Sequence, residues 1–193
     1  MFYRFILFAA SLFLLACHNK ETVVQQPQEK VDSVQPQQFI PVTAFILAEI
    51  GEMDSMPITP MRIIKENGKT DSAWGKKKDL LAFAQQFLQP AIDSSLGKYF
   101  KETSFMDASI PALTFSYDPK APLPDSLSIR RWDVYLHPQS QALQRAYFEK
   151  LVSNNGNPQK VLMTWKAKTY CSIVHIDMKT EKVVKEEKMI WGN

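Results

Sequence analysis

Glycine, histidine and cysteine are scarce in this chain, which contains six, three and two of them among 193 residues. The glycines form neither a GxGxxG pattern nor a Walker pattern, and this excludes the common glycine-rich phosphate loops. His137, Cys171 and His175 stand in no HExxH or CxxC spacing. The sequence therefore predicts neither a metal site nor a cofactor.

An excess of charge of one sign is also lacking. Lysine and arginine number 23 and aspartate and glutamate 20, which gives a formal net charge of +3. We therefore expect no nucleic-acid partner, because no strong positive field is present. The content of 45% apolar, 11% aromatic and 22% charged residues is that of an ordinary globular protein. It excludes a wholly disordered, a collagen-like or a multi-span membrane protein.

The N-terminus has no apolar run long enough to cross a bilayer as a helix. Phe5 to Ala16 is a run of twelve residues with one polar member, Ser11, whereas a spanning helix needs about 20. Arg4 and the free amine precede this run as a short positive region. The arrangement is typical of an export signal peptide.

The end of this segment, Leu14-Leu15-Ala16-Cys17, resembles the lipobox of bacterial lipoproteins. The resemblance covers only residues 1–17. It implies that residues 1–16 are a signal peptide cleaved before Cys17, and that Cys17 is diacylated on its sulfur and acylated on its new amine. Such chains would hold the protein at a membrane, since each buried methylene contributes about 0.8 kcal/mol. The alternative is an ordinary secretory signal with a coincidental cysteine.

The residues after Cys17 favour one membrane. His18 stands where an aspartate would indicate inner-membrane retention, by the rule known for enterobacteria. Lys20-Glu21 is a poor match to the acidic runs that send some lipoproteins to the cell surface. We therefore expect a lipid-anchored protein of the cell envelope on the periplasmic face of the outer membrane.

The next segment reads as a tether. Residues 18–38 contain six glutamines, two prolines and no aromatic residue, a composition that cannot form a packed core. We therefore expect the lipidated cysteine and a disordered tether at 17–38, and a single globular domain at 39–193. With Cys17 lipidated, Cys171 has no partner for an intramolecular disulfide.

Helical spacing dominates the first part of this domain. An i, i+4, i+8 pattern predicts a helix from Val42 to about Met53, with a buried strand as the alternative. Residues 61–66 suit a short strand before a turn at Asn67-Gly68. Asp71 and Ser72 offer an N-cap for a long helical region, which Pro90 ends or kinks and which resumes through Phe100.

Alternation of apolar and polar residues dominates the second part. It predicts strands at 113–117, 132–136, 161–165, 169–176 and 182–191. Residues 142–151 are ambiguous, because Leu143, Tyr147 and Leu151 fit a helix whereas the tight flanking turns suit a hairpin, and we expect a strand there. We therefore expect an α+β fold in which N-terminal helices pack on a curved, mainly antiparallel meander of about five to six strands. This element order resembles the cone-shaped folds of the NTF2-like or cystatin-like type.

The candidate catalytic residues do not form a constellation. Cys171 and His175 would lie about 13 Å apart on one face of a strand, too far for proton transfer. Asp133 and His137 could join a serine only through distant segments. Two carboxylate sets do not form acid/base pairs either: adjacent Glu186 and Glu187 point to opposite faces of a strand, and Glu102 and Asp107 suit capping or turn positions. The sequence therefore predicts no catalytic residue.

Basic and aromatic residues leave alternatives open. Lys76-Lys77-Lys78 is either a solvated helix start or a contact for phosphates or anionic lipid headgroups. Arg130-Arg131 suits an ordinary strand with its polar side outward. The tryptophans suit either core packing or a hydrophobic groove; they are Trp74, Trp132, Trp165 and Trp191.

The sequence leaves three functional hypotheses open. The leading hypothesis is a non-catalytic binding or assembly module that is anchored to the membrane and binds an envelope protein. The second is a carrier or sensor of an apolar ligand, with a cavity of about 300 Å³ or more lined by Trp, Phe and Met. The third is an enzyme with a cone-shaped pocket into which Asp133, His137 or His175 would point.

Overall fold

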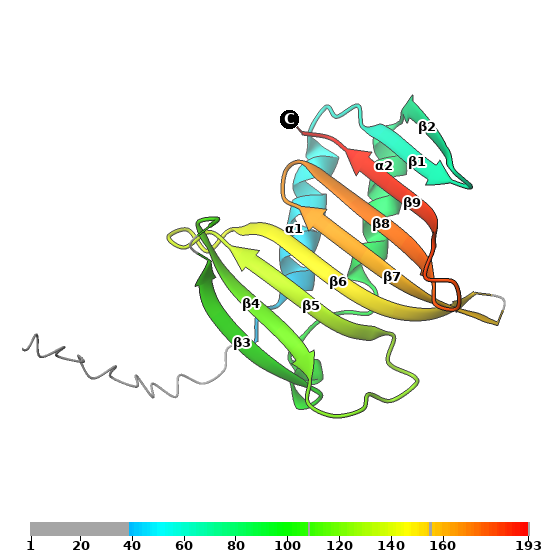
Figure 1. The fold of residues 1–193 in the computed structure, drawn as a ribbon. Coiled ribbons are helices and arrows are strands. Elements are labelled where there is room, and N and C mark those ends of the chain that lie inside the picture. The colour runs from blue at the N-terminus through cyan, green and yellow to red at the C-terminus, as the bar shows by residue number, and fades with distance from the viewer. Residues whose placement is uncertain (1–38, 108, 155, 193) are drawn as a thin grey trace, which may run out of the picture. The chain divides into compact units, whose positions relative to one another are not determined.

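The computed structural model describes residues 39–107, 109–154 and 156–192. They form one antiparallel sheet of nine strands, with helices α1 (Val42–Ser55) and α2 (Lys77–Ala84) behind it in the view of Figure 1. The prediction of helices packed on five to six strands is therefore wrong, because the sheet is larger and the two helices are short. The likeness to NTF2-like or cystatin-like cones rested on that element order, so it is not supported either.

The strand order is β2-β1-β9-β8-β7-β6-β5-β4-β3, so the first hairpin adds to the edge formed by the last strand. The single-turn helices η1 (Gln85–Leu88) and η2 (Ser94–Lys98) follow α2. The strands are β1 (Met61–Glu66), β2 (Lys69–Trp74), β3 (Phe100–Asp107), β4 (Ala112–Pro119), β5 (Ile129–Leu136), β6 (Leu143–Asn154), β7 (Asn157–Lys166), β8 (Tyr170–Asp177) and β9 (Val183–Ile190).

Strand β2 replaces the predicted start of a long helix. Asn67 and Gly68 both have positive φ, 52° and 72°, as a two-residue hairpin turn of type I′ requires. The turn returns the chain along β1, so that Lys69 pairs with Glu66 and Trp74 with Met61. All six residues of β2 are exposed, so its sequence lacks the alternation by which a strand is recognised.

Strand β3 was missed for the same reason. It is the other edge of the sheet, and Phe105 and Met106 within it are 49% and 59% exposed. Glu102, expected as a capping or turn residue, lies in β3 and accepts a hydrogen bond of 2.7 Å from the Tyr117 hydroxyl. Asp107, expected in the same role, is the last residue of β3.

The core lies between the sheet and the helices. Helix α1 turns one stripe of its residues to the sheet: Val42, Ile46, Glu49, Ile50 and Met53 are buried. Below this stripe, aromatic rings form two groups. In one, Trp132 stacks on Tyr117 at 4.6 Å and meets Phe100 edge-on at 4.5 Å. In the other, Phe87 meets Phe148 and Trp165 edge-on. We call this side of the sheet the covered face and the opposite side the open face (Figure 1).

A buried lysine on the covered face ties the sheet to η1. Lys150 is 8% exposed, and its ammonium donates to the carbonyl oxygens of Gln86 and Gln89. Burial lowers the pKa of Lys150 from 10.5 to about 8. The carbonyls at the end of η1 favour the charged form of Lys150, but they do not offset the free-energy cost of removing its ammonium group from water.

We expect Lys150 to make stability rise with pH. The unfolded chain keeps the Lys150 proton up to about pH 10.5, whereas the folded chain releases it near pH 8. Between these values the unfolded state binds more protons, so alkali favours the folded state. Relative to Lys150→Met, the native chain should gain about 2 kcal/mol of unfolding free energy from pH 8 to pH 10. Urea titrations across this range measure the gain, and parallel curves for the two proteins would refute it.

Candidate functional site

The C-terminal half of α1 forms one wall of a surface pocket of about 310 Å³. The opposite wall comes from the β7–β8 turn and from the residues after β9. Most of the lining is apolar, and three charged residues complete it. We call this the α1 pocket; it is lined by Glu49, Glu52, Met53, Met56, Ile58, Lys168 and Trp191.

Glu49 joins the two walls of the pocket. It is 9% exposed, and one of its carboxylate oxygens accepts a 2.7 Å hydrogen bond from Trp165 Nε1. The other oxygen accepts the backbone N–H of Lys168 in the β7–β8 turn. Both oxygens are therefore used in holding α1 against the end of the sheet, and Glu49 has a structural role.

The chain after β9 holds the same turn from another side. The backbone N–H groups of Trp191 and Gly192 both donate to the carbonyl oxygen of Thr169, at 2.9 and 3.1 Å. Gly192 is needed here, because a Cβ at this position would lie 1.9 Å from the carbonyl oxygen of Lys168. The Trp191 ring packs on Trp165 with 5.4 Å between ring centroids. This packing fixes Trp191 as one side of the pocket.

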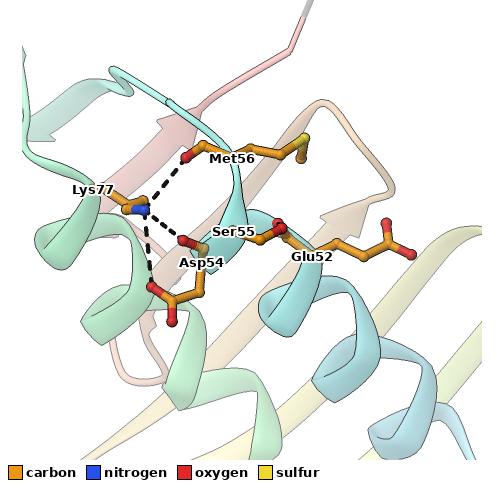
Figure 2. Close-up of polar contacts among 5 residues, drawn as sticks. All are labelled: Glu52, Asp54, Ser55, Met56 and Lys77. Carbon is orange, nitrogen blue, oxygen red and sulfur yellow. Dashed lines mark hydrogen bonds and ion pairs between the residues drawn. The ribbon is translucent and has the colours of Figure 1, made fainter.

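Lys77 fixes the end of α1, where Figure 2 shows it pointing at the last carbonyls of that helix. Its ammonium lies 2.5 Å from the carbonyl oxygen of Asp54, 3.4 Å from that of Met56 and 4.0 Å from Asp54 Oδ1. A cation at a helix C-terminus is favourable, because the unpaired carbonyls carry partial negative charge. Lys77, from the run of three lysines, thus caps α1 and positions Met56 at the pocket rim.

Cys171 and His175 do not form a nucleophile and its base. Cys171 is fully buried, and burial raises the pKa of its thiol well above the ordinary value, with smaller contributions from Glu49 and Glu187. His175 Nδ1 lies 3.2 Å from the side-chain oxygen of Gln159. Burial also lowers the pKa of His175, assisted by Lys185. The cysteine is a core residue in its thiol form.

Asp133 and His137 have separate partners. Asp133 Oδ1 lies 3.3 Å from Arg131 Nη2. His137 Nδ1 accepts from the backbone N–H groups of Gln139 and Ser140, at 3.4 and 3.3 Å, within its own turn. The structure therefore does not bring these two residues together as two members of a triad.

The remaining charged candidates form ion pairs. Glu186 pairs with Lys65 at 3.1 Å, whereas Glu187 binds Arg62 at 2.6 Å and Lys185 at 3.0 Å. These interactions lower the pKa of Glu187 although its burial opposes them. The two glutamates thus have different partners and do not form an acid/base pair.

The arginines have different surroundings. Arg131, on β5, lies 3.6 Å from Asp118. The Nε atom of Arg130 is buried without a hydrogen-bond partner among the described residues.

The four tryptophans divide between core, pocket and surface. Trp132 and Trp165 are fully buried. Trp191 is half-buried and lines the α1 pocket. Trp74, expected at a helix start, lies in β2 and is 71% exposed. The alternatives of core and groove thus apply to different tryptophans.

Two features are absent from the part of the chain that the structure describes, namely a cluster of metal ligands and a helix able to cross a membrane. In residues 39–107, 109–154 and 156–192, no group of three or more His, Cys, Asp and Glu is arranged to hold a metal ion. No helix among these residues has the length and apolarity to cross a membrane. Cys17, the predicted lipidation site, lies outside the described residues.

The α1 pocket itself was not predicted from the sequence. Met56 and Ile58 flank Pro57, and at the sequence level this segment reads only as the end of a helix. Trp191 and Lys168 join them from more than a hundred residues away. No local signal could have found this grouping.

Comparison of the chain with protein-family models, with curated proteins and with solved structures found no match.

Proposed function

We propose that the protein is a non-catalytic binding module of the cell envelope, anchored by lipid at Cys17, whose α1 pocket receives an apolar group of its partner. The observation that carries the proposal is the pocket wall formed by Met53, Met56, Ile58 and Trp191. Met53 is buried at the base of this wall, whereas Met56, Ile58 and Trp191 stay partly open to solvent. Such apolar side chains gain free energy when a partner covers them. Methionine suits such a wall, because its flexible thioether adapts to the group that it contacts.

Binding is favoured over catalysis by the state of the candidate groups. The Cys171 thiol is buried and held in its neutral form. The ring of His137 is bound to its own turn, and Asp133 is bound to Arg131. A general acid or base must reach the proton that it transfers. Cys171 and Asp133 are held by other contacts, and the hydrogen bonds that the described residues make to the His137 ring come from backbone N–H groups and not from a nucleophile.

A carrier of a small apolar ligand is the second candidate. The volume of the α1 pocket, about 310 Å³, reaches the lower end of small-molecule sites. The space between helices and sheet is filled by core side chains, including Phe87, Phe148 and Trp165. A ligand would therefore occupy the end of the sheet and not the interior, so the pocket suits one apolar group better than an entire lipid.

We expect Met56→Glu to abolish most of the affinity of the pocket for an apolar probe. The neutral dye N-phenyl-1-naphthylamine should bind the unit Gln35–Asn193, which contains every described element, and its fluorescence should rise to saturation. Covering a methionine side chain contributes about 1.5–3 kcal/mol, so a charge in its place should weaken binding by about tenfold or more. A fluorescence titration measures this.

Leu47→Glu is the matched control for this experiment. Leu47 lies on α1, whereas Met56 directly follows that helix; Leu47 is 54% exposed, compared with 43% for Met56, but it does not line the pocket. The Leu47 variant should bind the dye as the native unit does. Equal affinities for the two variants, or the absence of saturable binding, would count against the proposal.

A further inference from the structure

A second pocket, of about 540 Å³, meets the α1 pocket at Lys168. The ends of β5, β6 and β7 and the turns beside them form its walls. Three cations line it, namely Arg145, Lys166 and Lys168, and none of its described lining residues is an aspartate or glutamate. We call it the basic pocket.

Two of these cations are direct neighbours across the sheet. Arg145 on β6 and Lys166 on β7 are opposite each other in the strand register. Both lie on the open face, since Ala146 and Trp165 beside them are buried on the covered face. Like charges directly opposite each other destabilise a sheet. Among the described residues neither cation has a carboxylate within 4.0 Å.

Carboxylates on the open face are occupied by other cations. Each of three such carboxylates has a lysine or arginine within ion-pair distance, and none reaches the basic pocket. These pairs are Glu149 with Lys160 at 3.4 Å, Asp133 with Arg131 at 3.3 Å, and Glu186 with Lys65 at 3.1 Å. The positive charge at the basic pocket is therefore uncompensated by the described residues.

The neighbours of the basic pocket suit an organic anion. Lys188 lies 3.9 Å above the centre of the Tyr170 ring and Lys166 lies 6.0 Å from it, which extends the positive region toward β9. Pro111 and Leu143 add apolar wall. His137 also lines the pocket, and its Nδ1 accepts backbone hydrogen bonds. In the neutral ring the proton is then on Nε2, which is a donor.

We propose that the basic pocket binds the phosphate group of an organic phosphate. The planar guanidinium of Arg145 can hold two phosphate oxygens, and the Lys166 ammonium a third. A bound dianion would attract both cations and so offset the repulsion between them. The residues beyond the three cations would contact the organic part of the ligand. This site goes beyond the function proposed for the α1 pocket and does not depend on it.

The test uses the full chain in an uncharged detergent, with thermal unfolding and calorimetry as readouts. Inorganic phosphate, phenyl phosphate, and phosphatidic acid added to the micelles are compared, with chloride at equal ionic strength as the reference. We expect at least one phosphate compound to raise the unfolding midpoint. Arg145→Gln and Lys166→Gln should each weaken its binding by about tenfold or more, because each removes a charge-assisted hydrogen bond.

Two further outcomes separate a binding site from a structural one. Without phosphate, Arg145→Gln and Lys166→Gln should unfold at the native temperature or above it, because each removes a repulsion. Lys160→Gln, which loses the same charge from an ion pair on the same face, should keep native phosphate affinity. A response to phosphatidic acid alone would identify a lipid headgroup, and a response to phenyl phosphate would identify a free ester. Equal responses in native chain and variants, or none beyond that to chloride, would overturn the proposal.

Discussion

Trp132→Ala is expected to lower the free energy of unfolding by about 3–5 kcal/mol, the usual range for removing a buried tryptophan. The side chain is fully buried. It stacks on Tyr117 at 4.6 Å and contacts Phe100 and Phe39 at 4.5 and 5.8 Å between ring centroids. Alanine would leave a cavity among these three rings. Urea denaturation followed by circular dichroism measures the loss.

Two further variants serve as comparisons for Trp132→Ala. Trp132→Phe should lose much less, because the Trp132 Nε1–H has no hydrogen-bond partner among the described residues, and phenylalanine removes that buried donor. Trp74→Ala should change stability by about 0.5 kcal/mol or less, since Trp74 is 71% exposed. Equal losses for Trp74 and Trp132 would contradict the described core.

Glu49→Ala is expected to lower the free energy of unfolding by about 2–4 kcal/mol. The carboxylate accepts from Trp165 Nε1 and from the backbone N–H of Lys168, and hydrogen bonds to charged groups contribute about 1.5–3 kcal/mol each. Alanine would leave both donors unpaired near the end of α1. Glu49→Gln should lose less, because its amide oxygen still serves one donor. Chemical denaturation of the three proteins measures the order.

Glu52→Ala is the control for Glu49, since Glu52 lies one turn further along α1 and is exposed. Its loss should stay within about 0.5 kcal/mol. A similar loss in the two alanine variants would show that Glu49 does not join α1 to the β7–β8 turn.

The parts of the fold that the sequence predicted are those in which burial leaves a periodic pattern. The helix expected from Val42 to about Met53 is α1, and the strand expected at 61–66 is β1. The ambiguous stretch 142–151, predicted as a strand, lies within β6 (Leu143–Asn154). In α1 and β6 helically spaced or alternate residues are buried, and their apolar identity indicates this. Strand β1 has no buried residue and is marked instead by the Asn67-Gly68 turn that follows it.

The missed strands are those whose position depends on partners and not on burial. Residues 69–74 are all exposed and mostly polar, and they become β2 because the turn at Asn67-Gly68 returns them to β1. Residues 100–107 become the edge strand β3 through pairing with β4. The β1–β2 hairpin at one edge and β3 at the other extend the expected meander to nine strands, and of these three only β1 was expected as a strand.

The α1 pocket lay beyond sequence reasoning for a related physical reason. Met53 and Met56 line a pocket only because Trp191 and the β7–β8 turn lie opposite them in the fold. That placement depends on Glu49, whose role as a buried acceptor is invisible until Trp165 and Lys168 are beside it. Long-range contacts of this kind carry no local periodicity.

Site-specific photo-cross-linking in cells tests the central claim most directly. A photoreactive benzophenone amino acid is placed at Met56, directly after α1, in the full chain, and a second strain carries it at Leu47 within α1. We predict that illumination yields a discrete adduct at position 56, that the adduct is absent at position 47, and that Trp191→Ala diminishes it. Equal labelling at both positions, or no adduct at position 56, would contradict a binding role for the α1 pocket.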